Sequence, residues 1–261
     1  MIVGTMNHPH RDLFEEMQWM ADMGLEFIDM TLEPPEVPSW KADPDKIRAA
    51  LERHRFKVVG HTPFYLPIAS AIEEVRRGAV AELRRCVRIF GALGAKWMNV
   101  HPDRYTPFHD RSFYIRRNIL SLSELHEDSE EHGVGLMVEN LPGEFNNARQ
   151  LSDILDPLPW VGLHMDFGHA NLLVQRNTSE EILERYGSRL RHVHLHDNKG
   201  GHEDLHMPLG TGTVDVRAVV RALKRLKYDS TITLEVFTPD RHFLKYSVDV
   251  LRRIWAEEHA S

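Results

Sequence analysis

The sequence predicts an α/β protein whose chain closes into a single (β/α)8 barrel. Short β-type runs alternate with longer segments of helical periodicity, eight such units follow one another, and most of the β-type runs end in His, Asp or Glu. Strands that alternate with helices pair in parallel through right-handed crossovers. Because barrels of this kind typically take about 250 residues, we expect the 261 residues to form one domain, residues 1–261.

The expected strands are short and are separated by polar or glycine-containing segments. They lie at residues 2–6, 26–30, 57–61, 97–101, 135–139, 162–166, 192–196 and 231–236. An open doubly wound sheet is the rival arrangement. It would not bring the ends of the third to eighth strands around one centre, so the closed barrel is preferred.

Helices are expected between the strands because apolar residues recur there at helical spacing. The series are Leu13, Met17 and Met20, then Val80, Leu83, Val87 and Phe90, and then the segments 115–131, 148–155, 216–226 and 248–256. Gly24, Gly94 and Gly133 each stand just before the next strand, where a helix C-cap is expected. Residues 33–40 and 198–214 are predicted to be functional loops.

The composition excludes some classes of protein and disfavours others. The formal net charge of −7 disfavours a nucleic-acid partner without excluding one, since phosphate neutralisation needs clustered Lys and Arg. Cys86 is the only cysteine, so neither a disulfide framework nor a thiolate zinc site can form. No apolar run approaches the ~18 residues of a membrane span, and no secretory signal is recognisable. We therefore expect a soluble, cytoplasmic protein without a membrane partner, and a homo-oligomer is compatible with the sequence.

Carboxylates and imidazoles at the strand ends are the candidate functional groups, since the active-site groups of such barrels lie there. Glu139 and Glu235 each end a β-type run, where an unpaired carboxylate would cost several kcal/mol or take up a proton. A bound cation removes that cost. His61 and His101 end adjacent strands at equivalent depth. One terminal histidine is often an ordinary strand cap, but two together indicate a site.

The sixth and seventh strands add groups of the same kind. Asp166 ends the sixth strand, and His169 follows three residues later in the turn. His192, His194 and His196 share one face of the seventh strand because side chains alternate. We favour His194 as a metal ligand, expect His192 to be a buried polar residue with a hydrogen-bonded partner, and expect His196 to line a substrate pocket.

The loop after the seventh strand contains Asp204-Leu205-His206, and such an Asp-x-His pair can chelate an ion from one side. Gly210 and Gly212 let the backbone approach a ligand closely, and loops after strands 7 and 8 often hold phosphate. The ligand set offers only N and O donors, which fits Zn, Mn, Co, Fe or Mg, with the histidines favouring Zn or Mn. The absence of H-E-x-x-H and G-x-S-x-G removes the commonest zinc-protease and serine-hydrolase interpretations.

Several of these segments together carry a family resemblance. They are Gly60-His61-Thr62-Pro63, Val100-His101-Pro102, Val138-Glu139-Asn140, Met165-Asp166-Phe167-Gly168-His169, His194-Leu195-His196-Asp197-Asn198, Asp204-Leu205-His206 with Leu209-Gly210, and Leu234-Glu235. This pattern resembles the xylose isomerase-like TIM-barrel superfamily, which contains sugar isomerases and epimerases and the endonuclease IV-type nucleases of AP endonuclease family 2. The resemblance covers nearly the whole chain and is specific for the superfamily more than for a substrate.

The epimerase branch of the superfamily implies one metal site, formed by Glu139, Asp166, His194 and Glu235. The two glutamates would also act as acid and base on opposite faces of a bound ketose, while the metal polarises the carbonyl and adjacent hydroxyl and stabilises an enediolate. The expected substrate-binding residues are His169, His196, Glu33 and Lys199.

The nuclease branch implies three ions that activate water and clamp a phosphodiester. The first would lie among His61, His101 and Glu139, the second among Glu139, Asp166, His194 and Glu235, and the third among His169, Asp204 and His206. All nine positions of that branch are matched in this sequence.

Departures from the nuclease pattern place the isomerase interpretation first. Phe64-Tyr65-Leu66-Pro67-Ile68 stands where the nucleases have a Tyr and an Asn-bearing turn, while His164 and His196 replace a Cys and an Asn. The loop after the second strand, basic in the nucleases, reads Glu33-Pro34-Pro35-Glu36 and would repel phosphate. We therefore expect a metal-dependent isomerase or epimerase of a small sugar, sugar phosphate or polyol-type substrate. An endonuclease IV-like phosphodiesterase acting on abasic DNA is the alternative, and a non-catalytic metal-binding barrel is the third interpretation.

Overall fold

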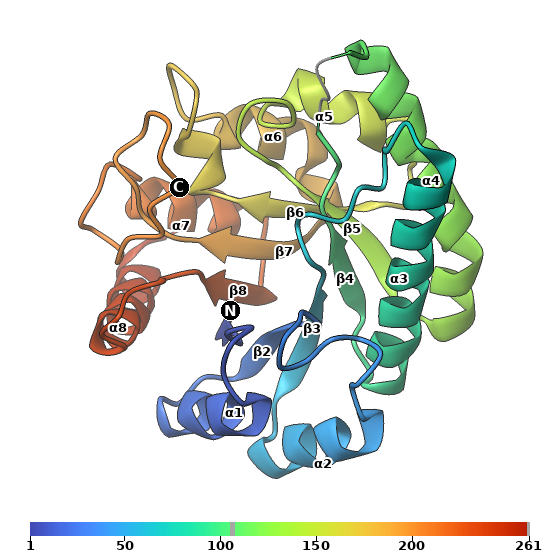
Figure 1. The fold of residues 1–261 in the computed structure, drawn as a ribbon. Helices are drawn as coiled ribbons and strands as arrows, with labels where there is room; N and C mark the ends of the chain where they lie inside the picture. Colours follow the sequence, from blue (N-terminus) through green and yellow to red (C-terminus); the bar gives the residue numbers. More distant parts are fainter. Residues whose placement is uncertain (105–107, 260–261) are drawn as a thin grey trace.

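The computed structural model describes residues 1–104 and 108–259 and has a closed barrel of eight parallel strands surrounded by helices (Figure 1). The strands pair in chain order, and β8 closes the barrel on β1. The predicted (β/α)8 barrel is thus confirmed, and the open doubly wound sheet is excluded.

The strands agree closely with those predicted. They are β1 Ile2–Met6, β2 Phe27–Thr31, β3 Lys57–His61, β4 Trp97–Val100, β5 Gly135–Glu139, β6 Gly162–Asp166, β7 Leu190–Leu195 and β8 Thr231–Leu234. Because β4, β7 and β8 end earlier than predicted, His101, His196 and Glu235 lie just after their strands. The chain leaves the sheet after Leu195, where Asp197 pairs with Met207 of the following loop.

The helices alternate with the strands and form the outer layer of the barrel. They are α1 Leu13–Asp22, α2 Pro44–His54, α3 Glu73–Ala92, α4 Arg111–His132, α5 Ala148–Leu155, α6 Ser179–Tyr186, α7 Val216–Arg225 and α8 His242–Glu257, with 3-10 turns η1 His169–Asn171 and η2 Gly187–Arg189. Periodicity did not locate α2 and α6. Gly133 ends α4 with a φ of 66°, as its position before β5 predicts.

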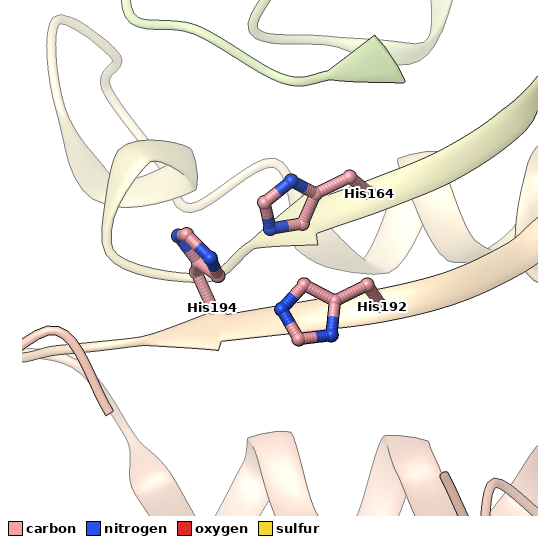
Figure 2. A group of neighbouring side chains, drawn as sticks. All are labelled: His164, His192 and His194. Atoms are coloured by element: carbon pink, nitrogen blue, oxygen red, sulfur yellow. The ribbon is translucent and has the colours of Figure 1, made fainter. Parts of the chain in front are cut away.

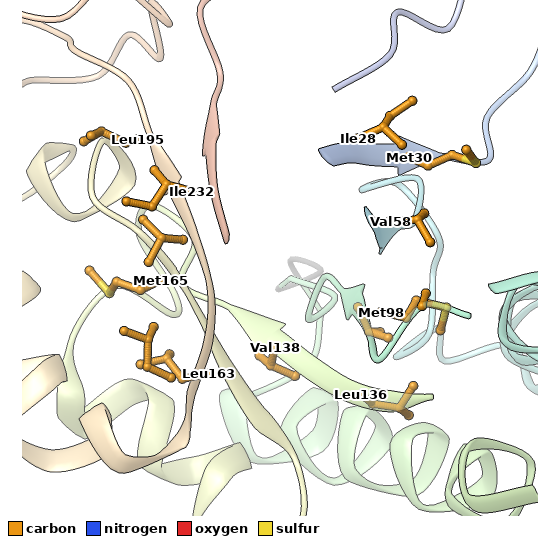
Figure 3. Packing of buried hydrophobic residues seen from close by; sticks show 14 of the residues in the cluster. Ile28, Met30, Val58, Met98, Leu136, Val138, Leu163, Met165, Leu195 and Ile232 are labelled. Atoms are coloured by element: carbon orange, nitrogen blue, oxygen red, sulfur yellow. The ribbon is translucent and has the colours of Figure 1, made fainter. Parts of the chain in front are cut away.

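The main hydrophobic core lies between the barrel and the helices. On β2, Ile28 and Met30 point outward into this layer (Figure 3). Phe27, Asp29 and Thr31 alternate with them along the strand and face the barrel interior. No helix among the described residues is long and apolar enough to cross a bilayer.

The barrel interior is unusually polar for this fold, in which branched apolar side chains normally fill it. A small apolar cluster of Phe27, Val59 and Met137 occupies part of it. Fully buried polar side chains occupy other positions, among them Asp29 and His192. These buried polar side chains extend from the barrel interior to the functional site at the carboxyl ends of the strands.

Candidate metal centre

The predicted ligands converge at the carboxyl ends of the strands, around a cavity of about 770 Å³. Those that line the cavity are His61, His101, Glu139, His169, Asp204, His206 and Glu235. Asp166 and His194 lie behind them and have no exposed surface. Residues from the ends of six strands, β3 to β8, and from the segments that follow β6 and β7 are therefore brought to a single rim.

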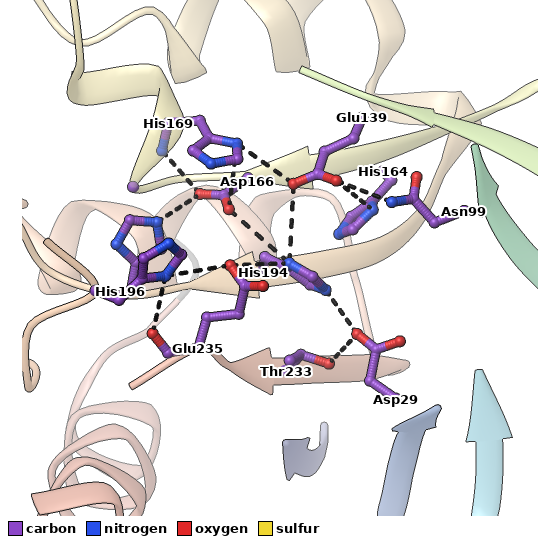
Figure 4. Close-up of polar contacts among 12 residues, drawn as sticks. Asp29, Asn99, Glu139, His164, Asp166, His169, His194, His196, Thr233 and Glu235 are labelled. Carbon is purple, nitrogen blue, oxygen red and sulfur yellow. Dashed lines mark hydrogen bonds and ion pairs between the residues drawn. The ribbon is translucent and has the colours of Figure 1, made fainter. Parts of the chain in front are cut away.

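Three carboxylates surround one imidazole nitrogen at the centre of the site. Nδ1 of His194 lies 3.2 Å from Oε2 of Glu235, 3.8 Å from Oε1 of Glu139 and 3.9 Å from Oδ2 of Asp166 (Figure 4). These are the four residues that the epimerase branch of the superfamily implies as one site.

A second group forms around the carboxylate of Asp204. Oδ2 of Asp204 lies 3.1 Å from Nε2 of His169 and 3.2 Å from Nε2 of His206. The other ring nitrogen of each histidine faces a backbone carbonyl, with Nδ1 of His169 3.0 Å from the oxygen of Asn140 and Nδ1 of His206 3.2 Å from that of Glu235. Because each Nδ1 faces a carbonyl, Nε2 is the nitrogen that faces Asp204. It donates to this carboxylate when protonated and offers a lone pair to a cation when deprotonated.

The third group joins His61 and His101 to Glu139. Nε2 of His101 lies 2.9 Å from Oε2 of Glu139, and one donor atom from each of the three residues lies within 4.8 Å of the others. Asn99 donates to the same Oε2 at 2.9 Å and fixes the carboxylate. Glu139 thus stands between this group and the central one.

The donor atoms of these groups fit a divalent cation. Asp166 Oδ2, His194 Nδ1, His61 Nδ1 and His196 Nε2 are buried without a hydrogen-bond partner. Each such atom costs about 1–3 kcal/mol if it stays unsatisfied. Metal ions bound in these groups would satisfy such atoms, and imidazole nitrogen with carboxylate oxygen is a donor set typical of zinc and similar ions.

The cluster keeps its acids ionised. Burial alone would raise the pKa of Glu139, but the neighbouring charge of His164 and hydrogen bonds from other imidazoles lower it well below its ordinary value. The pKa values of Asp166 and Glu235 are likewise lowered, against burial, chiefly by His169 and His194 respectively. The site therefore offers negative charge at neutral pH.

The pKa values of three imidazoles shift in the opposite direction, upward. Burial would lower the pKa of His194, but the charge of Glu235 raises it well above its ordinary value. The charge of Asp166 likewise raises the pKa of His169 well above its ordinary value, against burial. The pKa of His206 rises to about 8, against burial, because of its hydrogen bond to Asp204. In the metal-free protein these rings hold protons that a cation has to displace.

The predicted substrate-binding residues divide into two sets. His169 and Glu33 line the cavity. His196 is fully buried, stacks on His206 with ring centroids 4.2 Å apart and lies with its Nε2 3.4 Å from Oδ1 of Asp166, so it belongs to the ligand cluster more than to the cavity wall. Lys199 is exposed and does not line the cavity, so the structure does not bring it to the site.

Sequence reasoning missed several polar residues that support the site. Asp29, in the middle of β2, lies 2.6 Å from Nε2 of His194, and His164 lies beside His192 and His194 (Figure 2). Asn99 was not identified either. The expectation for His192 is confirmed, since it is buried and hydrogen-bonded to Thr231 at 2.7 Å. The sequence feature that could have identified Asp29 is a single acidic residue within an otherwise largely apolar strand.

With this geometry established, comparison with known proteins assigns the family. Residues 17–254 match the family model of the xylose isomerase-like TIM barrel, so the chain belongs to that family. The family and the acid–imidazole cluster in the cavity together identify the chain as an enzyme.

Three similar proteins illustrate the range of the family. A probable endonuclease 4 of Aquifex aeolicus is 26% identical over 257 residues, covering 90% of each chain. A fructoselysine 3-epimerase of Shigella flexneri is 23% identical over 248 residues, covering 90% of this chain and 88% of that protein. The crystal structure of a D-tagatose 3-epimerase-like protein superposes with a TM-score of 0.88 at 23% identity, covering 98% of both chains.

Proposed function

We propose that the protein is a metal-dependent isomerase or epimerase of a small sugar, sugar phosphate or polyol-type substrate. The observation that carries this proposal is the central group, in which His194 Nδ1 faces Glu139, Asp166 and Glu235 within 3.2 to 3.9 Å. The epimerases among the similar proteins support the same reaction class.

These four side chains would hold one divalent ion, zinc or manganese by their donor atoms. Such an ion, when bound, polarises a substrate carbonyl and the hydroxyl beside it. The cavity in front of the group is lined on its other sides by residues that suit a polyol, including Asn7, Thr62 and Glu33 as hydrogen-bonding groups and Phe64 as an apolar surface.

Glu139 and Glu235 are the proposed acid and base. They enter the cavity from β5 and from the end of β8, two strands that are separated by β6 and β7 in the closed barrel. A sugar between them would have a carboxyl group on either side. One ionised glutamate would remove the proton from the carbon next to the carbonyl. The other glutamate, also ionised in the free protein, would first take up a proton from solvent when the substrate binds and would then return it to the opposite face.

The test is proton exchange at carbon. The zinc- or manganese-loaded protein is incubated in D2O with a panel of ketoses and ketose phosphates, and deuterium incorporation next to the carbonyl is followed by NMR. We expect EDTA-sensitive exchange with at least one substrate, and a loss of about 10²–10⁴-fold in Glu139→Gln and Glu235→Gln. Full activity of either variant on the true substrate would refute its assignment.

A second candidate function is phosphodiester cleavage of abasic DNA by an endonuclease IV-like mechanism. The observation that favours it is that the two outer groups, His61–His101–Glu139 and His169–Asp204–His206, also bring their donor atoms together. The similarity to a probable endonuclease 4 supports it too. Efficient, EDTA-sensitive incision of a duplex with one abasic site, together with two or three tightly bound ions per chain, would favour this function over the isomerase.

A further inference from the structure

A buried carboxylate lies directly beneath the central group. Asp29 projects from β2 into the barrel interior and has no exposed surface. Its Oδ2 lies 2.6 Å from Nε2 of His194 and 2.9 Å from the hydroxyl oxygen of Thr233 (Figure 4). It also lies 3.1 Å from Nε2 of His192. Three potential donors therefore converge on one carboxylate oxygen.

These contacts fix where the protons lie. An ionised carboxylate only accepts hydrogen bonds, so Nε2 of His194 carries a hydrogen that it donates to Asp29. The hydroxyl group of Thr233 donates to the same oxygen of Asp29, which is therefore acting as an acceptor. With Nε2 occupied in this way, Nδ1 of His194 is the nitrogen left to face Glu139, Asp166 and Glu235.

The other candidate ligands are oriented differently. His169 and His206 direct Nδ1 at backbone carbonyls and leave Nε2 for the site. In His194 the roles of the two nitrogens are exchanged, and a side-chain carboxylate takes the place of the carbonyl. Because a carboxylate is charged, it also makes the imidazole a more basic ligand than a carbonyl would. A side chain, unlike a carbonyl, can be removed by substitution.

We propose that Asp29 is a positioning residue that sets the tautomer and orientation of His194 and so determines the affinity of the central site for its ion. This inference rests on the proposed function only in assuming that the central group binds a divalent cation. Loss of such an outer carboxylate typically weakens metal affinity about 10–100-fold. Asp29 would act without touching the ion or the substrate.

A competing role for Asp29 is direct ligation. Its Oδ1 lies 3.7 Å from Nδ1 of His61, and donor atoms of Asp29, His61 and His194 lie within 4.8 Å of one another. The hydrogen-bonded geometry of Oδ2 favours positioning, since the short contact to His194 leaves no room for an ion between the two atoms. The number of ions per chain separates these roles.

The experiment measures zinc binding to the full-length protein by competition with a chromophoric chelator, with the ion count taken by mass spectrometry. For Asp29→Asn we expect about 10–100-fold weaker binding of one ion, with the saturating number of ions unchanged. Thr233→Val is the matched control, because it removes one donor to the same oxygen and leaves the Asp29–His194 contact intact. It is expected to bind zinc within about threefold of the wild type, by the same reasoning.

A ¹⁵N-histidine NMR spectrum of the zinc-loaded wild type gives a second reading that needs no variant. We expect a solvent-protected proton on Nε2 of His194 and zinc on Nδ1. A proton on Nδ1, unchanged affinity in Asp29→Asn, or loss of one whole ion in that variant would each overturn the inference. A wild type that binds no zinc would instead refute the proposed function.

Discussion

Acidification should weaken metal binding in a way that the site's own pKa values determine. The central ion has to displace the proton of His194, whose pKa is raised well above its ordinary value, chiefly by Glu235. Glu139 and Asp166 have lowered pKa values, so they are already ionised and release no proton when the ion binds. One proton is therefore expected to leave for each central ion bound.

The magnitude follows from proton linkage. Below the pKa of His194, each displaced proton weakens apparent affinity about tenfold per pH unit, so lowering the pH by two units within that range should weaken the central site by up to about 100-fold. An ion held by His169, Asp204 and His206 has two such protons to displace, because the pKa of His169 is also raised and that of His206 is about 8. Its affinity should fall more steeply.

The same shifts give the sign of the stability change in the metal-free protein. The pKa of His206 rises to about 8 in the folded state, above the unfolded value of about 6.5. Its imidazolium therefore stabilises the fold fully below pH ~6.5, and this contribution is lost as the pH rises through about 8. Metal loading should remove that dependence.

Isothermal titration calorimetry provides the assay. Zinc is titrated into chelator-treated protein at several pH values, in buffers of different ionisation enthalpy, so that released protons are counted directly. His194→Gln is the control, since it should abolish the proton released by the central ion. Apparent affinity that is constant over this pH range, with no proton release, would refute the assignment of these rings as ligands.

Three further predictions concern the structure around the site. Asp197 accepts hydrogen bonds from the backbone N–H groups of Gly210, Gly212 and Val214. The Asp197→Asn variant should therefore lose about 1–3 kcal/mol of stability in chemical unfolding and bind the ion held by Asp204 more weakly. Unchanged stability would contradict this prediction. Leu136→Ala, in the outer core, should cost about 2–5 kcal/mol without altering zinc affinity. EDTA should lower the melting temperature of the loaded protein, since zinc at about 100 times its dissociation constant adds ~2.7 kcal/mol; an unchanged melting temperature would count against a specific ion.

The fold was accessible from the sequence because the periodicity changes sharply between strands and helices. β1, β3, β5 and β6 have the predicted bounds, since apolar residues fill these strands and polar groups end them. The bounds of β7 and β8 are set by tertiary contacts instead: the pairing of Asp197 with Met207 ends β7 before His196. Such contacts leave no mark in local periodicity.

The site was accessible for a different reason. A closed barrel brings all strand ends to one rim, so Glu139, His194 and Glu235 were predictable as neighbours from their positions alone. Asp29 was missed because it lies in mid-strand, where it is supported by hydrogen bonds from other strands. Lys199, which was also predicted to bind substrate, is exposed in the loop after β7 and does not line the cavity.

Metal binding by the central group can be observed in a crystal structure of the zinc-soaked protein with anomalous data collected at the zinc edge. An anomalous peak is expected within bonding distance of Glu139, Asp166, His194 and Glu235, with Nδ1 of His194 as the coordinating nitrogen. A crystal with zinc elsewhere and no peak among these four side chains would contradict this prediction.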